Sequence, residues 1–439
     1  MMVNRLNRKG VSTIIAVVLL IVGLVIGTGV GYAATYKSTT SSTTTSTQNN
    51  LSGTINIGVL ADMTDGLASE GIKINYTAHQ AVDQINAYLA NTIYAGKVKF
   101  NVIVEDYALD NTKAQNDMNT FKSDGVTVVV GPLNSGTAQS LLSFANSNQM
   151  VMISPSSTSA AIAIPNDYLF RTAPTDVVQG QADAAMMYQD GAKAVIQVYR
   201  QDTYGSGLAN YTSASFTKLG GTVVAQIPYD TTTTDFSPVL ATLNTDWQSA
   251  VAKYGNDGVA IQLISFDEGA TIIQQASQQY PNLLKTQQPW YGVDGEQGES
   301  AFTNSTIASA IQAVRLPATV FGYTNSSKTQ QLCTQILAAT ALTCDPYPLG
   351  AFDDVWIGAL SILACGENSG SCVQKELTTV ADNYYGVTGW TELNANGDRA
   401  ASDYLIYCIS GPTNNLQWNV CGTWSFQTNQ VTWINKPAT

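Results

Sequence analysis

Apolar residues recur along the chain at two periods, and the two periods alternate. Residues 55–59 have an apolar side chain at every second position, which predicts a strand, and residues 78–89 then show apolar side chains at helical spacing. The same alternation continues through a strand at 98–104, a helix around 114–121 and buried runs at 126–130 and 150–153. Strands that alternate with helices of this length predict βαβ units around a parallel sheet.

The pattern restarts after residue 190, with apolar runs at 194–198, 222–227, 259–264 and 290–293. The sequence therefore predicts an α/β fold with two doubly wound parallel-sheet lobes. Lobe 1 is expected at about 53–172 and 321–385, and lobe 2 at about 173–320 and 386–439. Because parallel sheets bind ligands at the carboxyl ends of their strands, we expect a ligand cleft between the lobes.

The first fifty residues have a different composition. A basic leader at 1–10 is followed by an uncharged apolar stretch that we interpret as a signal or anchor helix at 11–34, long enough to cross a bilayer. The bases before it predict a cytoplasmic N-terminus and an extracellular body. A Ser/Thr-rich stalk follows at 35–52. The body is thus expected outside the cell, secreted or anchored to the membrane by this helix.

The junction at residues 8–15, Arg-Lys-Gly-Val-Ser-Thr-Ile-Ile, resembles the archaeal prepilin-type (class III) leader. That resemblance implies an archaeal source and cleavage after Gly10, before the apolar stretch. The alternatives are an uncleaved anchor and a secretory signal cut near residues 31–33. All three alternatives place the body outside the cell.

Charge excludes one class of partner. Charged residues make up 12% of the chain, about half of the usual share of roughly 25%. The formal net charge is −12, and no acidic residue precedes Asp62, so all the acidic residues lie in the body. An acidic body of this kind repels phosphates, and we expect no nucleic-acid partner.

The cysteines also indicate an extracellular protein. All six lie in the last quarter of the chain as three close pairs, and the simplest of 15 pairings joins Cys333 to Cys344, Cys365 to Cys372 and Cys408 to Cys421. With a single histidine and no CxxC motif, a zinc site is not expected. Asn-x-Ser/Thr sequons suggest a glycoprotein; they begin at Asn50, Asn75, Asn210, Asn304 and Asn325.

Several motifs occur in a recognisable order: AVDQIN at 81–86, EDY at 105–107 with DNTKA at 110–114, ISPSST at 153–158, FRT at 170–172, DTYG at 202–205, GVTG at 386–389 and NGDR at 396–399. From about residue 54 to 412 the chain resembles the branched-chain amino-acid-binding proteins, the type I periplasmic family that feeds ABC importers. The resemblance implies an amino-acid ligand, an ABC permease as partner and three crossings between lobes, near Thr172, near 317–323 and near Tyr385.

An amino acid is a zwitterion, so its site needs donors for a carboxylate and an acceptor for an ammonium. A loop that leads into a helix supplies such donors, because the backbone N–H groups of the first helical turn are free. Motif by motif, the resemblance implies carboxylate contacts at Ser135, Ser156 and Thr158 and an ammonium contact at Asp294. The alternatives are ordinary helix caps for the hydroxyl residues and an ordinary Asp-Gly turn at Asp294.

Three further residues are candidates for the cleft wall. Tyr204 is expected to lie over the ligand, although packing at the strand end is an alternative. Phe266 falls near an aromatic position of the family, and the alignment equally allows Ser265. Glu70 lies in the first loop, which often lines the cleft of such proteins.

The sequence predicts no enzyme. One histidine excludes a Ser/His/Asp or Cys/His arrangement, and no strand is followed by a Walker A or GxGxxG motif. We expect neither cofactor nor metal. The main hypothesis is an extracellular solute-binding protein of an ABC importer that captures an apolar or small polar amino acid. The alternatives are a binder of urea or short amides, a pilin-like surface subunit and an extracellular sensor.

Overall fold

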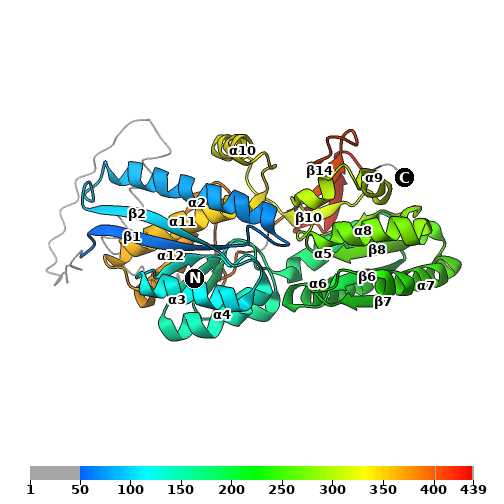
Figure 1. Ribbon diagram of the computed structural model, residues 1–439, viewed down its shortest axis with the longest axis horizontal. Helices are drawn as coiled ribbons and strands as arrows, with labels where there is room; N and C mark the ends of the chain where they lie inside the picture. Colours follow the sequence, from blue (N-terminus) through cyan, green and yellow to red (C-terminus); the bar gives the residue numbers. More distant parts are fainter. Residues whose placement is uncertain (1–49, 401, 438–439) are drawn as a thin grey trace, which may run out of the picture.

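The computed structural model describes residues 50–400 and 402–437, which form two lobes lying side by side (Figure 1). The predicted leader, the anchor helix and nearly all of the stalk lie outside the described residues. Each lobe has a parallel sheet with helices on both faces, so the predicted two-lobed α/β fold is confirmed.

The sheet of lobe 1 has five parallel strands in the order β2-β1-β3-β4-β5. Its strands are β1 (Gly53–Ala61), β2 (Val98–Asp106), β3 (Val128–Val130), β4 (Val151–Ser154) and β5 (Leu169–Arg171). The helices around it are α2 (Ala68–Leu89), α3 (Asn111–Ser123), α4 (Ser135–Asn148), α10 (Ser327–Thr340), α11 (Pro346–Cys365) and α12 (Gly370–Asp382). All residues of β3 and β4 are buried because helices cover both faces.

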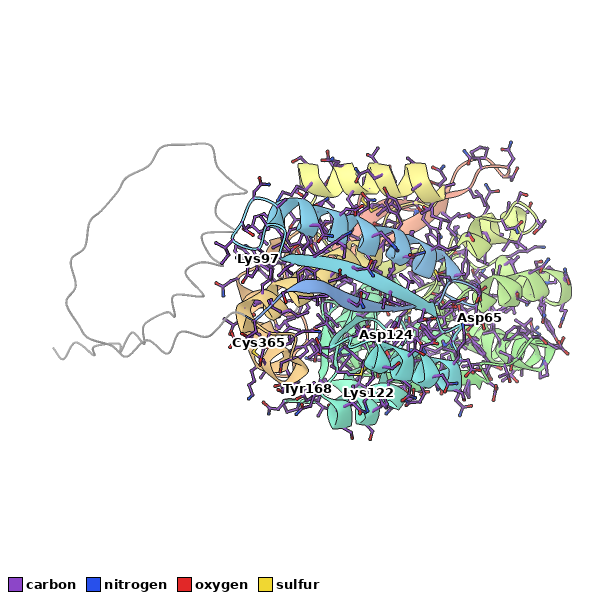
Figure 2. The ribbon with its side chains drawn as sticks, turned by 60° about the vertical axis from the view of Figure 1, so that its left-hand side comes forward. Asp65, Lys97, Lys122, Asp124, Tyr168 and Cys365 are labelled. Carbon is purple, nitrogen blue, oxygen red and sulfur yellow. A yellow bond between two sulfur atoms is a disulfide. The ribbon has the colours of Figure 1, made fainter. Side chains whose placement is uncertain are left out.

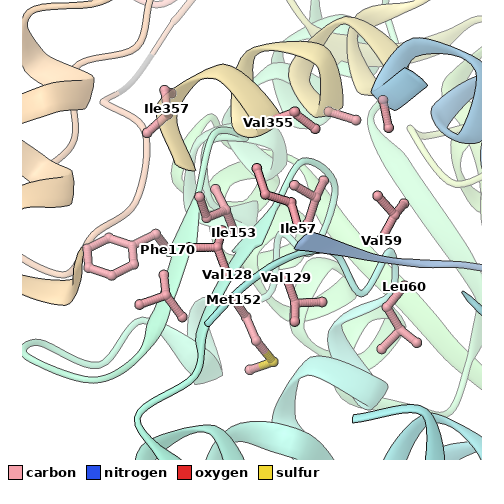
Figure 3. Packing of buried hydrophobic residues seen from close by; sticks show 14 of the residues in the cluster. Ile57, Val59, Leu60, Val128, Val129, Met152, Ile153, Phe170, Val355 and Ile357 are labelled. Atoms are coloured by element: carbon pink, nitrogen blue, oxygen red, sulfur yellow. The ribbon is translucent and has the colours of Figure 1, made fainter. Parts of the chain in front are cut away.

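The core of lobe 1 follows the two-residue period of its strands. Ile57 and Val59 point toward α11 and meet Val355, whereas Leu60 and Met152 point to the opposite face (Figure 3). Helix α11 is long and apolar enough to cross a membrane, yet 89% of its most apolar window is buried inside the protein. It is therefore the core helix of lobe 1.

Lobe 2 combines two sheets. A parallel sheet in the order β7-β6-β8-β9 is followed by an antiparallel sheet in the order β10-β13-β14-β15, and a parallel bridge from Gly292 to Ala318 links them. The strands are β6 (Ala194–Arg200), β7 (Thr222–Tyr229), β8 (Val259–Ile264), β9 (Trp290–Tyr291), β10 (Ala318–Phe321), β13 (Tyr404–Ser410), β14 (Gln417–Ser425) and β15 (Gln430–Trp433). The helices are α5 (Asp176–Gln189), α6 (Thr203–Lys218), α7 (Ser237–Tyr254), α8 (Glu268–Gln279) and α9 (Ala308–Val314).

The chain passes between the lobes after β5, after β10 and before β13. The sequence placed the last crossing near Tyr385. In the structure the short hairpin of β11 (Tyr385–Gly386) and β12 (Gly389–Trp390) comes first, and Val387 and Leu393 pack in the core of lobe 1. A buried ion pair of 2.6 Å between Arg171 and Asp398 then ties this segment to β5.

The carboxyl ends of the strands of lobe 1 face lobe 2. Lys97, just before β2, lies at the far end of lobe 1, and Asp65, in the loop after β1, lies at the end next to lobe 2 (Figure 2). Cys365, at the end of α11, also lies at the far end (Figure 2). The loops that carry the predicted site residues therefore meet between the lobes.

All three predicted disulfides are present, joining Cys333 to Cys344, Cys365 to Cys372 and Cys408 to Cys421. The first ties α10 to the start of α11, the second joins α11 to α12, and the third crosses β13 and β14. Two of them therefore brace the helices of lobe 1, and the third braces the antiparallel sheet of lobe 2.

Candidate functional site

A small cavity lies between the lobes, where the loops after the strands meet. Its volume is about 30 Å³, room for one or two water molecules. Six of the seven predicted residues line it, and Thr158 does not. The lining residues are Leu67, Glu70, Leu133, Asn134, Ser135, Ser156, Tyr204, Phe266, Asp294, Gly295 and Tyr347.

Lobe 1 contributes the loop between β3 and α4. Gly131 turns this loop with a φ of 109°, and a Cβ there would lie 2.3 Å from the Leu60 carbonyl oxygen, so only glycine fits. No side chain caps α4, because Asn134 accepts a hydrogen bond of 2.7 Å from the Tyr107 hydroxyl instead. The N–H groups of the first turn of α4 therefore remain available to an anion beside the cavity.

The hydroxyls of the two lining serines are set up differently. Ser135 Oγ accepts a hydrogen bond of 3.1 Å from the Ser159 N–H, which leaves its own hydroxyl hydrogen free to donate. Ser156 Oγ donates at 2.9 Å to the Leu133 carbonyl, so it has only lone pairs left to offer. Ser135 thus suits a carboxylate, whereas the Ser156 side chain as arranged suits a donor.

Thr158 lies further along the loop after β4 and is buried. Its hydroxyl lies near the carboxyl of Asp176, at the start of α5, but no hydrogen bond of normal geometry forms between them. Burial and the nearby Asp294 together raise the pKa of Asp176 to about 8. This pair sits where the chain crosses between the lobes.

Asp294, from the loop after β9, is the acidic residue of lobe 2 on the cavity wall. Its carboxylate accepts a hydrogen bond of 2.5 Å from the Tyr204 hydroxyl, one of 2.8 Å from Gln179 Nε2 and one from the Tyr347 hydroxyl. Burial raises the pKa of Asp294, and these three donors counteract that effect. All three donors are neutral, so the carboxylate has partners but no neutralising cation.

The aromatic wall is supported from behind. Tyr204 stacks on Phe266 with ring centroids 5.6 Å apart, and the Arg200 guanidinium lies 3.5 Å from the centroid of the Phe266 ring. Of the two residues that the alignment allowed, Phe266 lines the cavity, whereas the Ser265 hydroxyl binds the buried carboxyl of Glu296. Tyr204 lines the cavity and packs on Phe266, and its expected position over the ligand stays a prediction.

Glu70 also lines the cavity, but as part of a buried charged cluster. Lys73 Nζ contacts Glu70 Oε1 at 2.5 Å and also contacts the Asp345 carboxylate. Glu299, from lobe 2, accepts a hydrogen bond of 3.3 Å from the Ser69 N–H of lobe 1. This charged cluster (Glu70, Lys73, Asp345 and Glu299) therefore spans the two lobes.

Tyr347 was not predicted, although it contacts Asp294 and lines the cavity. It sits in the first turn of α11, where Asp345 accepts a hydrogen bond of 3.0 Å from the Tyr347 N–H and Pro346 occupies the first helical position. An aspartate followed by proline is a typical helix start. That signal could have indicated a helix N-terminus, but not that this helix reaches the cleft.

The fold and the cavity define a two-lobed periplasmic-type binding protein. Residues 75–411 match the family model described as receptor family ligand binding region, and the chain belongs to this family. An uncharacterised protein of Methanocaldococcus jannaschii is 29% identical over 397 residues, covering 86% of this chain and 91% of that protein.

One further relative and one solved structure are similar to this chain. The Leu/Ile/Val-binding protein BraC3 of Rhizobium johnstonii is 26% identical over 338 residues, 74% of this chain and 83% of that protein. The substrate-binding protein LivJ of Streptococcus pneumoniae, solved in complex with isoleucine, has a TM-score of 0.64 at 22% identity, covering 84% of this chain and 100% of that one. The predicted type I fold and branched-chain amino-acid-binding family are confirmed; family and fold are those of substrate-binding proteins.

Proposed function

We propose that this protein is the extracellular solute-binding component of an ABC importer and captures an amino acid by closing its lobes. The observation that carries the proposal is the pairing of opposite chemistries across one cavity. Lobe 1 presents Ser135 and the uncapped start of α4, and lobe 2 presents Asp294. A free amino acid has one group for each side.

The direction of binding follows from charge. The ligand carboxylate rests on Ser135 and on the N–H groups of α4. The ammonium lies against Asp294 and the lone pairs of Ser156 Oγ. Asp294 has accepted three hydrogen bonds of the roughly four that a carboxylate can accept, so one position remains for the ligand.

Because the two ends of the ligand are held by different lobes, only the closed form satisfies both. The ligand shifts the open–closed equilibrium through this difference in affinity. The cavity of about 30 Å³ is smaller than an amino acid, so the lobes must sit further apart when a ligand is bound between them.

Titration calorimetry on the full-length chain tests the proposal. We expect saturable binding of a free amino acid and none of its amide derivative, which lacks the carboxylate. Equal binding of urea or a short neutral amide in place of any amino acid would refute the proposal and favour the amide-binding alternative.

We further propose that residues 11–34 hold the mature protein on the outer face of the membrane. The support is the uncharged stretch preceded by bases. Fractionation should find the protein with membranes and its body open to added protease. An N-terminus at Val11 in mass spectrometry supports prepilin-type processing, whereas one near Ala34 contradicts anchoring by this helix.

A further inference from the structure

The charged cluster contains polar atoms that the protein leaves without partners. Glu70 Oε2 and Glu299 Oε1 are buried and make no hydrogen bond. Gln297, two residues before Glu299, is also buried, and neither its Oε1 nor its Nε2 has a partner. An unsatisfied buried polar group is destabilising, so four such atoms in one region require an explanation.

These atoms belong to one contact region. Gly298 has a φ of 88°, and a Cβ there would lie 2.5 Å from Glu70 Oε1 and 3.1 Å from Lys73 Nζ. The lobe 2 segment from Gln297 to Glu299 therefore rests directly on the lobe 1 half of the cluster. Ser69 Oγ also accepts a hydrogen bond of 3.1 Å from the Ser300 N–H across the same contact.

The charges in this region do not balance. Three carboxylates, Glu70, Asp345 and Glu299, surround the single ammonium of Lys73, which is shared between two of them. The cavity itself is lined by two acidic residues, Glu70 and Asp294, and by no basic residue. In the described part of the chain no group of acidic, histidine or cysteine side chains has an arrangement that could hold a metal ion.

Tyr347 lies between the two acidic residues of the cavity. Its hydroxyl contacts Asp294, and its N–H donates to Asp345, which contacts Lys73 and through it Glu70. Asp294, Tyr347 and Glu70 all line the same cavity. An extended ligand with a cationic group at each end can reach both.

We propose that the preferred ligand is an amino acid with a second, cationic hydrogen-bond donor at the end of its side chain, and that Glu70 and Glu299 receive this donor. The inference rests on the proposed function for the backbone end of the ligand. It adds a specificity determinant at the side-chain end. An amine or guanidinium would satisfy the unpartnered carboxylate oxygens and offset the excess negative charge.

The pKa shifts of the two buried carboxyls agree with this proposal. Burial and the nearby Asp345 raise the pKa of Glu70 well above its usual range, and burial raises the pKa of Glu299 to about 8. A cation bound beside these carboxyls would lower both pKa values, because it stabilises their charged forms.

Calorimetry on the full-length chain with L-lysine, L-ornithine, L-leucine and 1,4-diaminobutane tests the proposal. We expect lysine or ornithine to bind at least tenfold more tightly than leucine. Glu70→Gln should weaken lysine binding at least tenfold more than leucine binding, so that the preference disappears. Asp83→Asn, an exposed acidic residue on the same helix, is the matched control and should change neither affinity. If Glu70→Gln fails to fold, Glu299→Gln carries the same expectation and leaves the Glu70–Lys73 pair intact.

The outcomes separate the two proposals. The proposal of a second cationic group is wrong if leucine binds more tightly than both basic amino acids, or if the preference is undiminished in the folded variant. Neither result contradicts amino-acid capture. If the diamine binds as tightly as lysine and loses as much affinity in Glu70→Gln, the ligand carboxylate contributes nothing to binding. Amino-acid capture then fails while the cationic site stands.

Discussion

Asp294 and Glu70 are both buried acidic residues on the wall of one cavity, yet the protein treats them in opposite ways. Asp294 accepts hydrogen bonds from three neutral donors and has no cationic partner. Glu70 contacts a cation, Lys73, but one of its oxygens has no partner. The first arrangement fixes a carboxylate in position and leaves its charge uncompensated. The second leaves a gap in the hydrogen bonding itself.

Burial of an acidic residue is therefore not sufficient to identify it as a ligand contact. The two carboxylates differ in what the protein leaves unsatisfied: at Asp294 it is the charge, and at Glu70 it is the hydrogen bonding of one oxygen. Under the two proposals above, Asp294 receives the backbone ammonium of the ligand and Glu70 receives its side-chain end.

The largest effect is expected at Asp294. Asp294→Asn preserves the shape and acceptor oxygen but removes the charge, so amino-acid binding should weaken by about 2–4 kcal/mol. Calorimetry measures this, with Asp83→Asn as control. If the affinity of Asp294→Asn stays within a factor of three of the wild type, the ammonium is not held here.

The charged cluster should make closure of the empty lobes depend on pH. Burial, together with the carboxylates of Glu70 and Asp267, raises the pKa of Glu299 to about 8, against about 4.3 for an exposed glutamate, although Lys73 and the hydrogen bond from Ser69 oppose the shift. Between these two pH values, closure of the lobes takes up a proton. Closure is therefore most favourable below the lower value, and its free energy becomes less favourable by about 1.4 kcal/mol per pH unit up to about pH 8.

Small-angle scattering measures this closure directly. The ligand-free protein should be more compact at pH 5 than at pH 9, and a bound basic amino acid should remove the difference. An empty protein that is equally compact at both pH values, or more compact at pH 9, would show that the charged cluster does not govern closure.

Removing one of the neutral donors should have a smaller effect. Tyr347→Phe deletes one hydrogen bond to Asp294 while Tyr204 and Gln179 remain, and we expect affinity to fall by about 1.5 kcal/mol. Loss of this donor also raises the pKa of Asp294, so the defect should grow as the pH falls. Calorimetry at pH 6 and pH 8 checks both points, and a defect that grows toward high pH would contradict the assigned role.

The smallest effect is expected at Ser135. Ser135→Ala removes one hydroxyl donor but leaves the N–H groups of α4, so affinity should fall by about 1 kcal/mol. Ser140→Ala, an exposed site on the same helix, is the matched control. A loss above tenfold at Ser135 would mean that the hydroxyl, and not the helix terminus, carries the carboxylate.

The period of the apolar residues was enough to predict both parallel sheets, because their strands are short buried runs between amphipathic helices. It did not reveal the antiparallel strands β13 to β15, where the sequence at 404–433 mixes Trp, Tyr and Thr without a clean alternation. Nor could it show that residues 386–393 remain with lobe 1, since this depends on hydrogen bonds from Val387 and Thr388 to the distant Asp353 of α11.

The candidate site was predictable as far as local motifs reach. Each loop could be recognised from its own residues, and six of the seven candidates line one cavity. The partners of these residues come from elsewhere in the chain: Tyr347 from the start of α11, Gln179 from α5 and Glu299 from the far lobe. Hydrogen bonds across more than fifty residues leave no local signal in the sequence.

The most direct test of the account is an experimental structure of the full-length protein with its bound amino acid. We expect the ligand carboxylate to lie at the start of α4, within hydrogen-bonding distance of Ser135, and the ligand ammonium to lie against Asp294. A ligand bound in the reverse direction, or bound outside the cavity between the lobes, would contradict it.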